Sequence, residues 1–126
     1  MADVLVMHSD ETVGLIPMLA LDGHSVFEAY GSGEMLQEAI RRQLDVLVIP
    51  DSQDTVGGVE LLGTLRRMTG AGIIMVGEGR SKDVASALLQ GADTYLAIPV
   101  NPRELRARLR GMLRGGRGQD APEVRE

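Results

Sequence analysis

Acidic residues follow two short apolar runs of the chain, where their carboxylates could act together. Asp10 comes soon after the run Val4–Met7, and Asp51 and Asp54 follow the run Val46–Ile49. Carboxylate oxygens are the ligands that Mg²⁺ prefers in proteins. One hypothesis is a cation site built from these three acids. The alternative is that they are solvated loop residues that cap turns or the following helix.

Two glycine-rich segments could bind an anion through their backbone N–H groups. Residues 77–82 read Gly-Glu-Gly-Arg-Ser-Lys between an apolar run and a helical pattern, and residues 31–33 read Gly-Ser-Gly. Loops that open a helix can cradle phosphate, although neither segment has the spacing of a P-loop or a dinucleotide fingerprint. The simpler interpretation is that the glycines form turns and that Ser81 is the N-cap of a helix.

The basic residues are concentrated near the C-terminus. Residues 103–117 hold six arginines and one acid, whereas residues 1–102 hold 14 acids and six basic residues. Arg106, Arg110 and Arg114 recur every four residues and would form one stripe of a helix. That stripe could contact nucleic-acid phosphates, pair with acids across a subunit interface, or be solvated. A net charge of −5 disfavours nucleic acid as a partner of the whole domain.

Composition limits the remaining chemistry. The chain has 126 residues, of which 44% are hydrophobic, and this suits one globular domain. The absence of cysteine excludes disulfides, thiolate metal sites and a cysteine nucleophile, and two histidines disfavour a zinc site. No apolar run reaches the roughly 18 residues that cross a bilayer, and no secretory leader opens the chain. We therefore expect a cytoplasmic protein with no membrane contact.

Short strands alternate with helical patterns along the chain. The runs Val4–Met7, Val46–Ile49 and Ile73–Val76 are wholly apolar, as strands buried on both faces are, whereas Ser25–Ala29 and Thr94–Ile98 are mixed, as edge strands are. The helical patterns cover Asp10–Leu21, Gly33–Gln43, Gly58–Met68, Ser81–Gln90 and a last helix that starts with Asn101 as N-cap and Pro102. We expect Pro17 to bend or shorten the first helix.

This alternation predicts an α/β fold with a doubly wound, five-stranded parallel sheet in the order 2-1-3-4-5, because β-α-β crossovers are right-handed. Ligands of such sheets bind beyond the carboxyl ends of the strands. The predicted domain covers residues 1–114. Residues 115–126 contain three glycines and a proline. We expect them to be a linker to a downstream domain or a disordered tail.

Two segments carry a resemblance to a known family. They read LDVLVIPDSQDTVGGVELLGTLR (residues 44–66) and GADTYLAIPVNPRELRARLRGMLR (residues 91–114). From about residue 3 to residue 114 the chain resembles the CheY-like receiver domain of bacterial response regulators, which implies the flavodoxin-like fold. Gly58 and Pro99 fall where that family keeps structural residues, and Tyr95 falls where it keeps an aromatic switch residue.

The resemblance implies phosphoryl transfer to an aspartate, but the residues for that chemistry are absent. The family uses an acidic pair that holds Mg²⁺, an acceptor aspartate, a hydroxyl residue and a lysine. The corresponding positions here are, in that order, His8 and Ser9, then Pro50, Gly77 and Ile98. His8 could instead be a pH-sensitive group or a hydrogen-bonded loop histidine. We therefore expect a degenerate receiver, or pseudo-receiver, with no enzymatic activity, no metal site and no cofactor.

The expected function is phosphorylation-independent signalling in an atypical response regulator. The domain would act through a partner protein or through dimerisation on an output domain, which alone would contact DNA. One alternative is a residual receiver that is phosphorylated at Asp51 with Mg²⁺. Another is a sensor that binds a small ligand through the glycine-rich loops.

The resemblance also suggests where a homodimer would form and how one turn is built. Family members often dimerise through the fourth helix, fifth strand and fifth helix, here residues 81–114. The candidate residues on this face are Val84, Asp93, Arg106, Arg108, Arg110 and Arg114. The Ile98–Pro99 bond should be cis, with the Ile98 side chain beside Pro50 and Gly77 in the vacated site.

Overall fold

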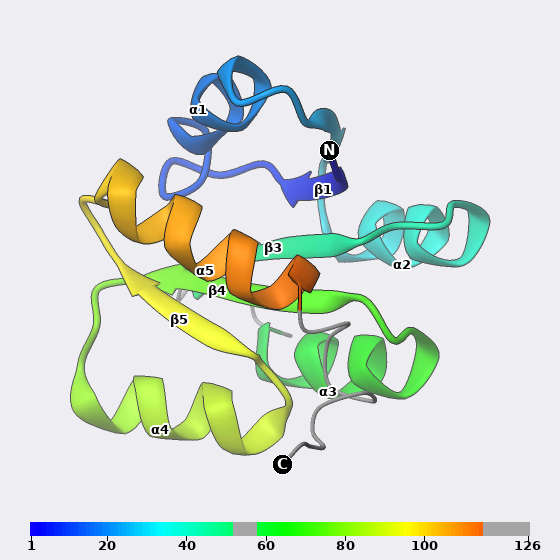
Figure 1. Ribbon diagram of the computed structural model, residues 1–126. Coiled ribbons are helices and arrows are strands. Elements are labelled where there is room, and N and C mark those ends of the chain that lie inside the picture. Colours follow the sequence, from blue (N-terminus) through cyan, green and yellow to red (C-terminus); the bar gives the residue numbers. More distant parts are fainter. Residues whose placement is uncertain (52–57, 115–126) are drawn as a thin grey trace, which may run out of the picture.

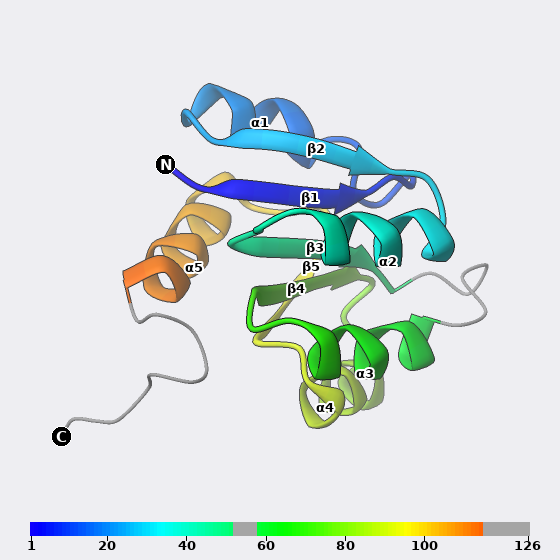
Figure 2. The same cartoon turned by 90° about the vertical axis from the view of Figure 1, so that its right-hand side faces the viewer.

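Five parallel strands form one sheet that is covered by helices on both faces (Figures 1 and 2). The computed structural model of the chain describes residues 1–51 and 58–114. The strands are β1 (Asp3–Met7), β2 (Ser25–Ala29), β3 (Val46–Pro50), β4 (Gly72–Gly77) and β5 (Thr94–Ala97). The helices are α1 (Leu15–Leu21), α2 (Ser32–Arg41), α3 (Gly58–Met68), α4 (Ser81–Gln90) and α5 (Pro102–Arg114). The strand order, β2-β1-β3-β4-β5, is the doubly wound order predicted from the sequence.

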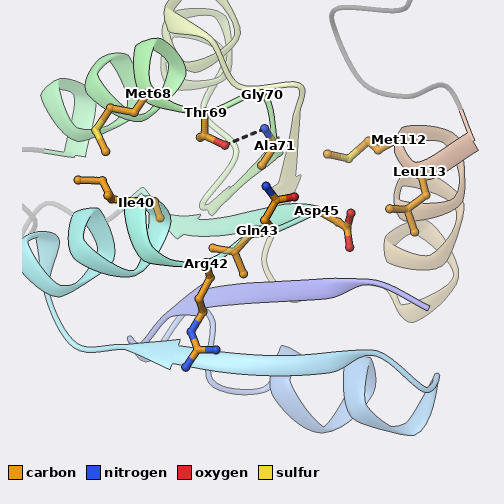
Figure 3. A pocket seen from close by; sticks show the side chains of 12 residues that line it. Ile40, Arg42, Gln43, Asp45, Met68, Thr69, Gly70, Ala71, Met112 and Leu113 are labelled. Carbon is orange, nitrogen blue, oxygen red and sulfur yellow. Dashed lines mark hydrogen bonds between the residues drawn. The ribbon is translucent and has the colours of Figure 1, made fainter.

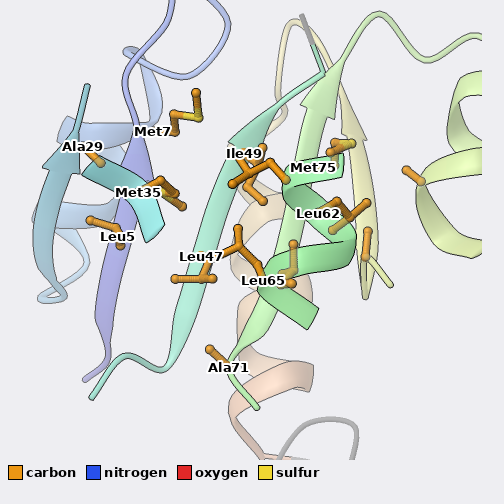
Figure 4. Packing of buried hydrophobic residues seen from close by; sticks show 14 residues of the cluster. Leu5, Met7, Ala29, Met35, Leu47, Ile49, Leu62, Leu65, Ala71 and Met75 are labelled. Atoms are coloured by element: carbon orange, nitrogen blue, oxygen red, sulfur yellow. The ribbon is translucent and has the colours of Figure 1, made fainter. Parts of the chain in front are cut away.

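The central strands supply two separate cores. Side chains alternate across a strand, so Leu5 of β1 joins the cluster beneath α2, α3 and α4, whereas Val4 and Val6 join the cluster beneath α1 and α5. Figure 4 shows the first cluster, with Leu47 and Ile49 of β3 between Met35 of α2 and Leu62 of α3. Every residue of β3 and β4 is buried. This explains why these strands are apolar throughout and do not alternate.

The helix boundaries agree with the sequence patterns except at α1. The predicted helix Asp10–Leu21 begins only at Leu15, because the preceding residues form turns closed by the Val13 N–H on the Ser9 carbonyl (2.9 Å). Pro17 therefore falls in the first helical turn, where a missing N–H leaves no hydrogen bond unmade. The expected shortening is confirmed.

The start of α5 is confirmed as well. The Asn101 side-chain oxygen accepts the backbone N–H of Arg103 at 2.8 Å and of Glu104 at 3.4 Å. These contacts satisfy two donors of the first turn that have no partner within the helix.

Candidate functional site

The positions that would carry receiver chemistry lie together at the carboxyl edge of the sheet. His8 and Ser9 follow β1, Pro50 and Gly77 end β3 and β4, and Ile98 follows β5. Because all five strands are parallel, these ends meet at one edge (Figure 2). The topology therefore places these residues at the predicted edge of the sheet. Which chemistry is possible there depends on their side chains.

The residues in place of the acidic pair make local contacts. The Ser9 hydroxyl accepts the N–H groups of Glu11 (3.1 Å) and Thr12 (3.2 Å), so it stabilises the turn after β1. The buried Thr12 hydroxyl donates to the Met7 carbonyl at 2.6 Å. The exposed His8 ring stacks on Tyr30, with ring centroids 4.9 Å apart and an interplanar angle of 13°. Neither replacement supplies a carboxylate.

Asp51 faces away from the vacated acceptor position. Pro50 is buried at the end of β3, and the Asp51 N–H continues the strand pairing by donating to the Val76 carbonyl at 2.6 Å. Successive side chains of an extended segment point to opposite faces, so Asp51 lies on the face of Ile49, which is covered by α2, α3 and α4. There it accepts a hydrogen bond of 2.9 Å from the Tyr95 hydroxyl.

Tyr95 occupies the space beside Gly77. A Cβ atom on Gly77 would overlap the Tyr95 hydroxyl and would lie 2.8 Å from the Asp51 Cβ. The same hydroxyl accepts the Gly79 N–H at 3.3 Å, and the ring packs against the cluster beneath α3 and α4. Desolvation is the main cause that raises the pKa of Tyr95, the Asp51 carboxylate adds to it and the hydrogen bond from the Gly79 N–H opposes it, so that the pKa is about 12. The hydroxyl therefore stays protonated and donates to Asp51 at neutral pH.

Tyr95 and Asp51, and not Ile98, fill the space beside Gly77, so that part of the predicted packing is wrong. The predicted position of Ile98 beside Pro50 stays a prediction. The atoms nearest a Cβ on Gly77 belong to Tyr95 and Asp51. Ile98 is 37% exposed and lines a groove of about 360 Å³ on the other face of the sheet, together with Leu15 of α1. The predicted cis bond at Ile98–Pro99 is confirmed.

The three acids proposed as a cation site do not converge in the part that the structure describes. Asp10 lines the groove beside α1 and Ile98, whereas Asp51 is hydrogen-bonded on the opposite face. Asp54 lies outside the described residues. Among the side chains that the structure describes, in residues 1–51 and 61–114, no three His, Cys, Asp or Glu residues gather as metal ligands would.

The glycine-rich loop after β4 is held by its own side chains. Ser81 is the first helical residue of α4, and the N-cap is Arg80, which makes no capping side-chain bond, so the prediction of Ser81 as N-cap is wrong. The Arg80 guanidinium pairs with Glu78 at 3.1 Å and with Asp83 at 3.5 Å. Gly79 adopts a φ of 84°, which glycine tolerates. In the other loop, Gly31 adopts a φ of 107° and is the N-cap of α2.

Several residues proposed for a dimer face have partners within the chain. Asp93 pairs with Arg66 (3.1 Å), Arg106 with Asp22 directly after α1 (2.8 Å), and Arg108 with Glu104 (3.5 Å).

The other three candidates differ in their surroundings. Val84 is half-buried in α4, Arg110 lines a groove between α1 and α5, and Arg114 is exposed at the end of α5. Sequence reasoning missed two exposed leucines of α4, Leu88 and Leu89, which are 45% and 87% exposed. Leu89 lies outside the apolar stripe of its helix, and that position is the signal that could have identified it.

A further groove lies at the opposite edge of the sheet (Figure 3). It measures about 510 Å³, and Ile40 and Met68 face Met112 and Leu113 across it. Its lining comes from the ends of α2, α3 and α5 and holds none of the receiver positions. No sequence motif indicated it.

Comparison with known proteins points to one family. No protein-family model matches the chain. The chain is 32% identical over 126 residues to the KDP operon transcriptional regulatory protein KdpE of Escherichia coli, covering 98% of this chain and 56% of KdpE. It is 31% identical over 122 residues to the DNA-binding response regulator MtrA of Mycolicibacterium smegmatis, covering 94% and 53%. The chain thus spans about half the length of these relatives.

A solved structure agrees with these relatives. The CheY-like response regulator receiver domain protein of Methanospirillum hungatei is 25% identical and superposes with a TM-score of 0.78, covering 90% of this chain and 94% of that one. Among the described residues, no helix is long and apolar enough to cross a membrane. Fold, sequence relatives and structural neighbour together support the assignment of this chain to the CheY-like receiver domains of response regulators.

Proposed function

We propose that this receiver domain signals without an aspartyl phosphate, as an interaction and dimerisation module that controls an output domain. The observation that carries the proposal is the contact between Tyr95 and Asp51 beside Gly77. A phosphoacceptor needs a free carboxylate oxygen and cations that offset the charge of the transferred group. Here Pro50, at the acceptor position, has no carboxylate, and the neighbouring Asp51 lies on the opposite face, where it binds the Tyr95 hydroxyl. Ile98, at the lysine position, brings no charge.

The output of the domain is proposed to be transcriptional. KdpE is named as a transcriptional regulatory protein and MtrA as a DNA-binding response regulator, and both are nearly twice as long as the part that this chain matches. We propose that residues 1–114 are the receiver, that residues 115–126 link it to an output domain in the cytoplasm, and that DNA is bound only by that output domain. Partner binding or dimerisation would then shift the population of active molecules.

Self-association is proposed to use the face formed by α4, β5 and α5. This proposal is supported by Leu88 and Leu89, which leave apolar surface exposed on α4. The internal ion pairs of Asp93, Arg106 and Arg108 weaken the case for a charge-paired interface. The leucines are therefore the better candidates for its centre.

Intact-mass spectrometry tests the phosphorylation-independent proposal. The chain is incubated with Mg²⁺ and acetyl phosphate, and Asp51→Asn and Asp10→Asn variants are treated in parallel. We expect no species heavier by one phosphoryl group in any of the three samples. A phosphorylated species of the wild-type chain that Asp51→Asn abolishes and Asp10→Asn retains would establish Asp51 as an acceptor and refute the proposal.

A further inference from the structure

A groove between α5 and the turn that follows α1, called here the groove between α1 and α5, combines an apolar floor with a basic rim. It measures about 360 Å³ and is lined by Leu109 and Leu113 of α5 below Arg106 and Arg110. Leu109 is buried and Leu113 is half-buried, so Leu113 supplies the accessible apolar surface of the floor. A ligand for this groove must combine small apolar groups with negative charge.

The other polar residues that line the groove, Asp22 and His24, do not cancel the positive charge of its two arginines. Asp22 accepts the Arg106 Nε–H at 2.8 Å, which occupies one of the five N–H donors of that guanidinium. His24 also lines the groove, and its Nδ1 accepts the Ala2 N–H at 3.1 Å, so its other ring nitrogen carries the donor hydrogen in the neutral form. Arg110 makes no ion pair with any described residue. Two arginines thus face a single acid.

The sequence that follows α5 has the matching chemistry. Residues 119–126 read Gln-Asp-Ala-Pro-Glu-Val-Arg-Glu, in which three acids are interspersed with three small apolar residues and one arginine. Gly115 and Gly116 come directly after the last residue of α5, and glycine permits the backbone angles of a sharp reversal. We propose that the chain reverses there and docks Asp120–Val124 in the groove between α1 and α5, with its acids on the arginines and its apolar side chains on the leucines.

The spacing of the charges suits this arrangement. Arg106 and Arg110 are one helical turn apart, about 6 Å along the axis. Asp120 and Glu123 are about 10 Å apart in an extended chain. Because arginine side chains are long and flexible, they can span the difference. Attachment to α5 keeps the segment at a high effective concentration, so weak contacts suffice to populate the docked state.

The larger groove in Figure 3 is the less suitable site for this segment. Its arginine, Arg42, already pairs with Glu38 at 2.6 Å, and Asp45 on its lining would repel the acids. Charge therefore favours the α1–α5 groove. Docking there would fix the direction in which the chain leaves the receiver domain. The inference does not depend on how the domain is activated.

Paramagnetic relaxation enhancement in the full chain tests the proposal. The chain has no cysteine, so Gln119→Cys gives a single attachment site for a nitroxide label without changing the charge of the segment. The amide signals of Asp22 and His24 are diagnostic, because both residues line the groove but are remote from the label in the sequence. We expect the label to weaken both signals, and we expect Asp120→Lys with Glu123→Lys to restore them.

Charge exchange across the groove provides the matched controls. Arg110→Glu should restore the two amide signals, and adding Glu123→Arg to that variant should weaken them again. Arg103→Glu, on an exposed position of α5 that does not line the groove, should leave the wild-type pattern unchanged. The proposal is overturned if the Asp22 and His24 signals do not respond to reversal of the acids. It is also overturned if the strongest enhancement falls on Ile40 and Met68, which line the other groove.

Discussion

At the scale of single residues, the Tyr95 hydroxyl connects segments that follow two different strands. It donates to Asp51 after β3 and accepts the Gly79 N–H in the loop after β4, at 2.9 and 3.3 Å. The contact is possible because Gly77 has no side chain, since a Cβ atom there would overlap the hydroxyl. The glycine at this position is thus directly linked to the position of the tyrosine.

The protonation of Tyr95 should make stability depend on alkaline pH. Its pKa is raised to about 12 in the folded chain from an ordinary value of 10.0, chiefly by desolvation. An unfolded chain loses this proton first, so the free energy of unfolding is unaffected below about pH 10. It should fall as the pH rises from 10 to 12.

Urea unfolding across this pH range measures the effect, and phenolate absorbance follows the titration because the chain has two tyrosines and no tryptophan. Tyr95→Phe should reduce the alkaline fall in stability. Tyr30→Phe, at an exposed position, should retain it. An equal fall in all three chains would show that Tyr95 is not its source.

Gly77→Ala should destabilise the chain by about 1–3 kcal/mol, because the added methyl group displaces the Tyr95 hydroxyl in a filled space. Combined with Tyr95→Phe, its cost should be smaller than in the wild-type chain, because the overlapping oxygen is gone. The control is Gly33→Ala in α2, where a Cβ meets no atom within 4 Å and the helix should gain about 0.4–1 kcal/mol. Chemical denaturation gives the free energy of unfolding of the wild-type chain, the two single variants, the double variant and the control. If the losses caused by Gly77→Ala and Tyr95→Phe simply add in the double variant, the overlap between the added methyl group and the hydroxyl is contradicted.

At the scale of elements, Arg66 of α3 joins two loops to the helix. Its guanidinium donates to the carbonyls of Thr69 (3.0 Å), Ala71 (2.6 Å) and Gly91 (3.0 Å), and to the Asp93 carboxylate (3.1 Å). Asp93 in turn accepts the Ile73 N–H at 2.8 Å. The end of α3, the start of β4 and the turn before β5 are therefore fixed by one side chain.

Arg66→Ala should lower the free energy of unfolding by about 2–3 kcal/mol, because it leaves several partly buried carbonyls unpaired. Its neighbour Arg67 is exposed, and among the side chains that the structure describes its guanidinium donates only to the Thr64 hydroxyl, at 3.4 Å. Arg67→Ala should change stability by less than about 0.5 kcal/mol. Similar thermal-unfolding curves for the two variants would contradict the structural role of Arg66.

Sequence patterns sufficed to predict the strands and helices, because hydrophobic runs and capping residues act within short stretches of the chain. The all-apolar runs of β3 and β4 are buried on both faces, and Asn101 caps α5 through atoms within three residues of itself. The sequence predicts the edge of the sheet at which the site lies. It does not predict the side-chain contacts there, because these contacts join residues far apart in the chain. Tyr95 lies 44 residues from Asp51. Which of Tyr95 and Ile98 fills the space beside Gly77 depends on the face to which each points.

At the scale of the whole molecule, the two helical layers differ in the apolar surface that they expose. The helices α4 and α1 lie on opposite faces of the sheet (Figure 1). On α4, Leu89 is 87% exposed and its neighbour Leu88 is 45% exposed, whereas on α1 Leu21 is 86% exposed as a single leucine. Scattered exposed leucines are ordinary. An adjacent pair on the face proposed for self-association provides a possible anchor for a second copy.

Sedimentation equilibrium at several concentrations tests this anchor. We expect a weak homodimer of the wild-type chain and a severalfold higher dissociation constant for Leu89→Gln, because the variant removes apolar area from the centre of the interface. Leu21→Gln is the matched control, because it makes the same substitution at an equally exposed leucine of α1. It should leave the dissociation constant unchanged. A strictly monomeric wild-type chain, or equal effects of both substitutions, would rule out the α4 face.

Amide NMR of the full chain during treatment with acetyl phosphate and Mg²⁺ tests signalling without an aspartyl phosphate most directly. The amide signals of Asp51, Gly79 and Tyr95 report on the contact that occupies the space beside Gly77. We predict that these signals keep their positions throughout, because Asp51 remains bound to Tyr95 and no phosphoryl group enters. Shifts of these signals that require both reagents, revert when the phosphodonor is consumed and vanish in Asp51→Asn would show that the domain is switched by phosphorylation.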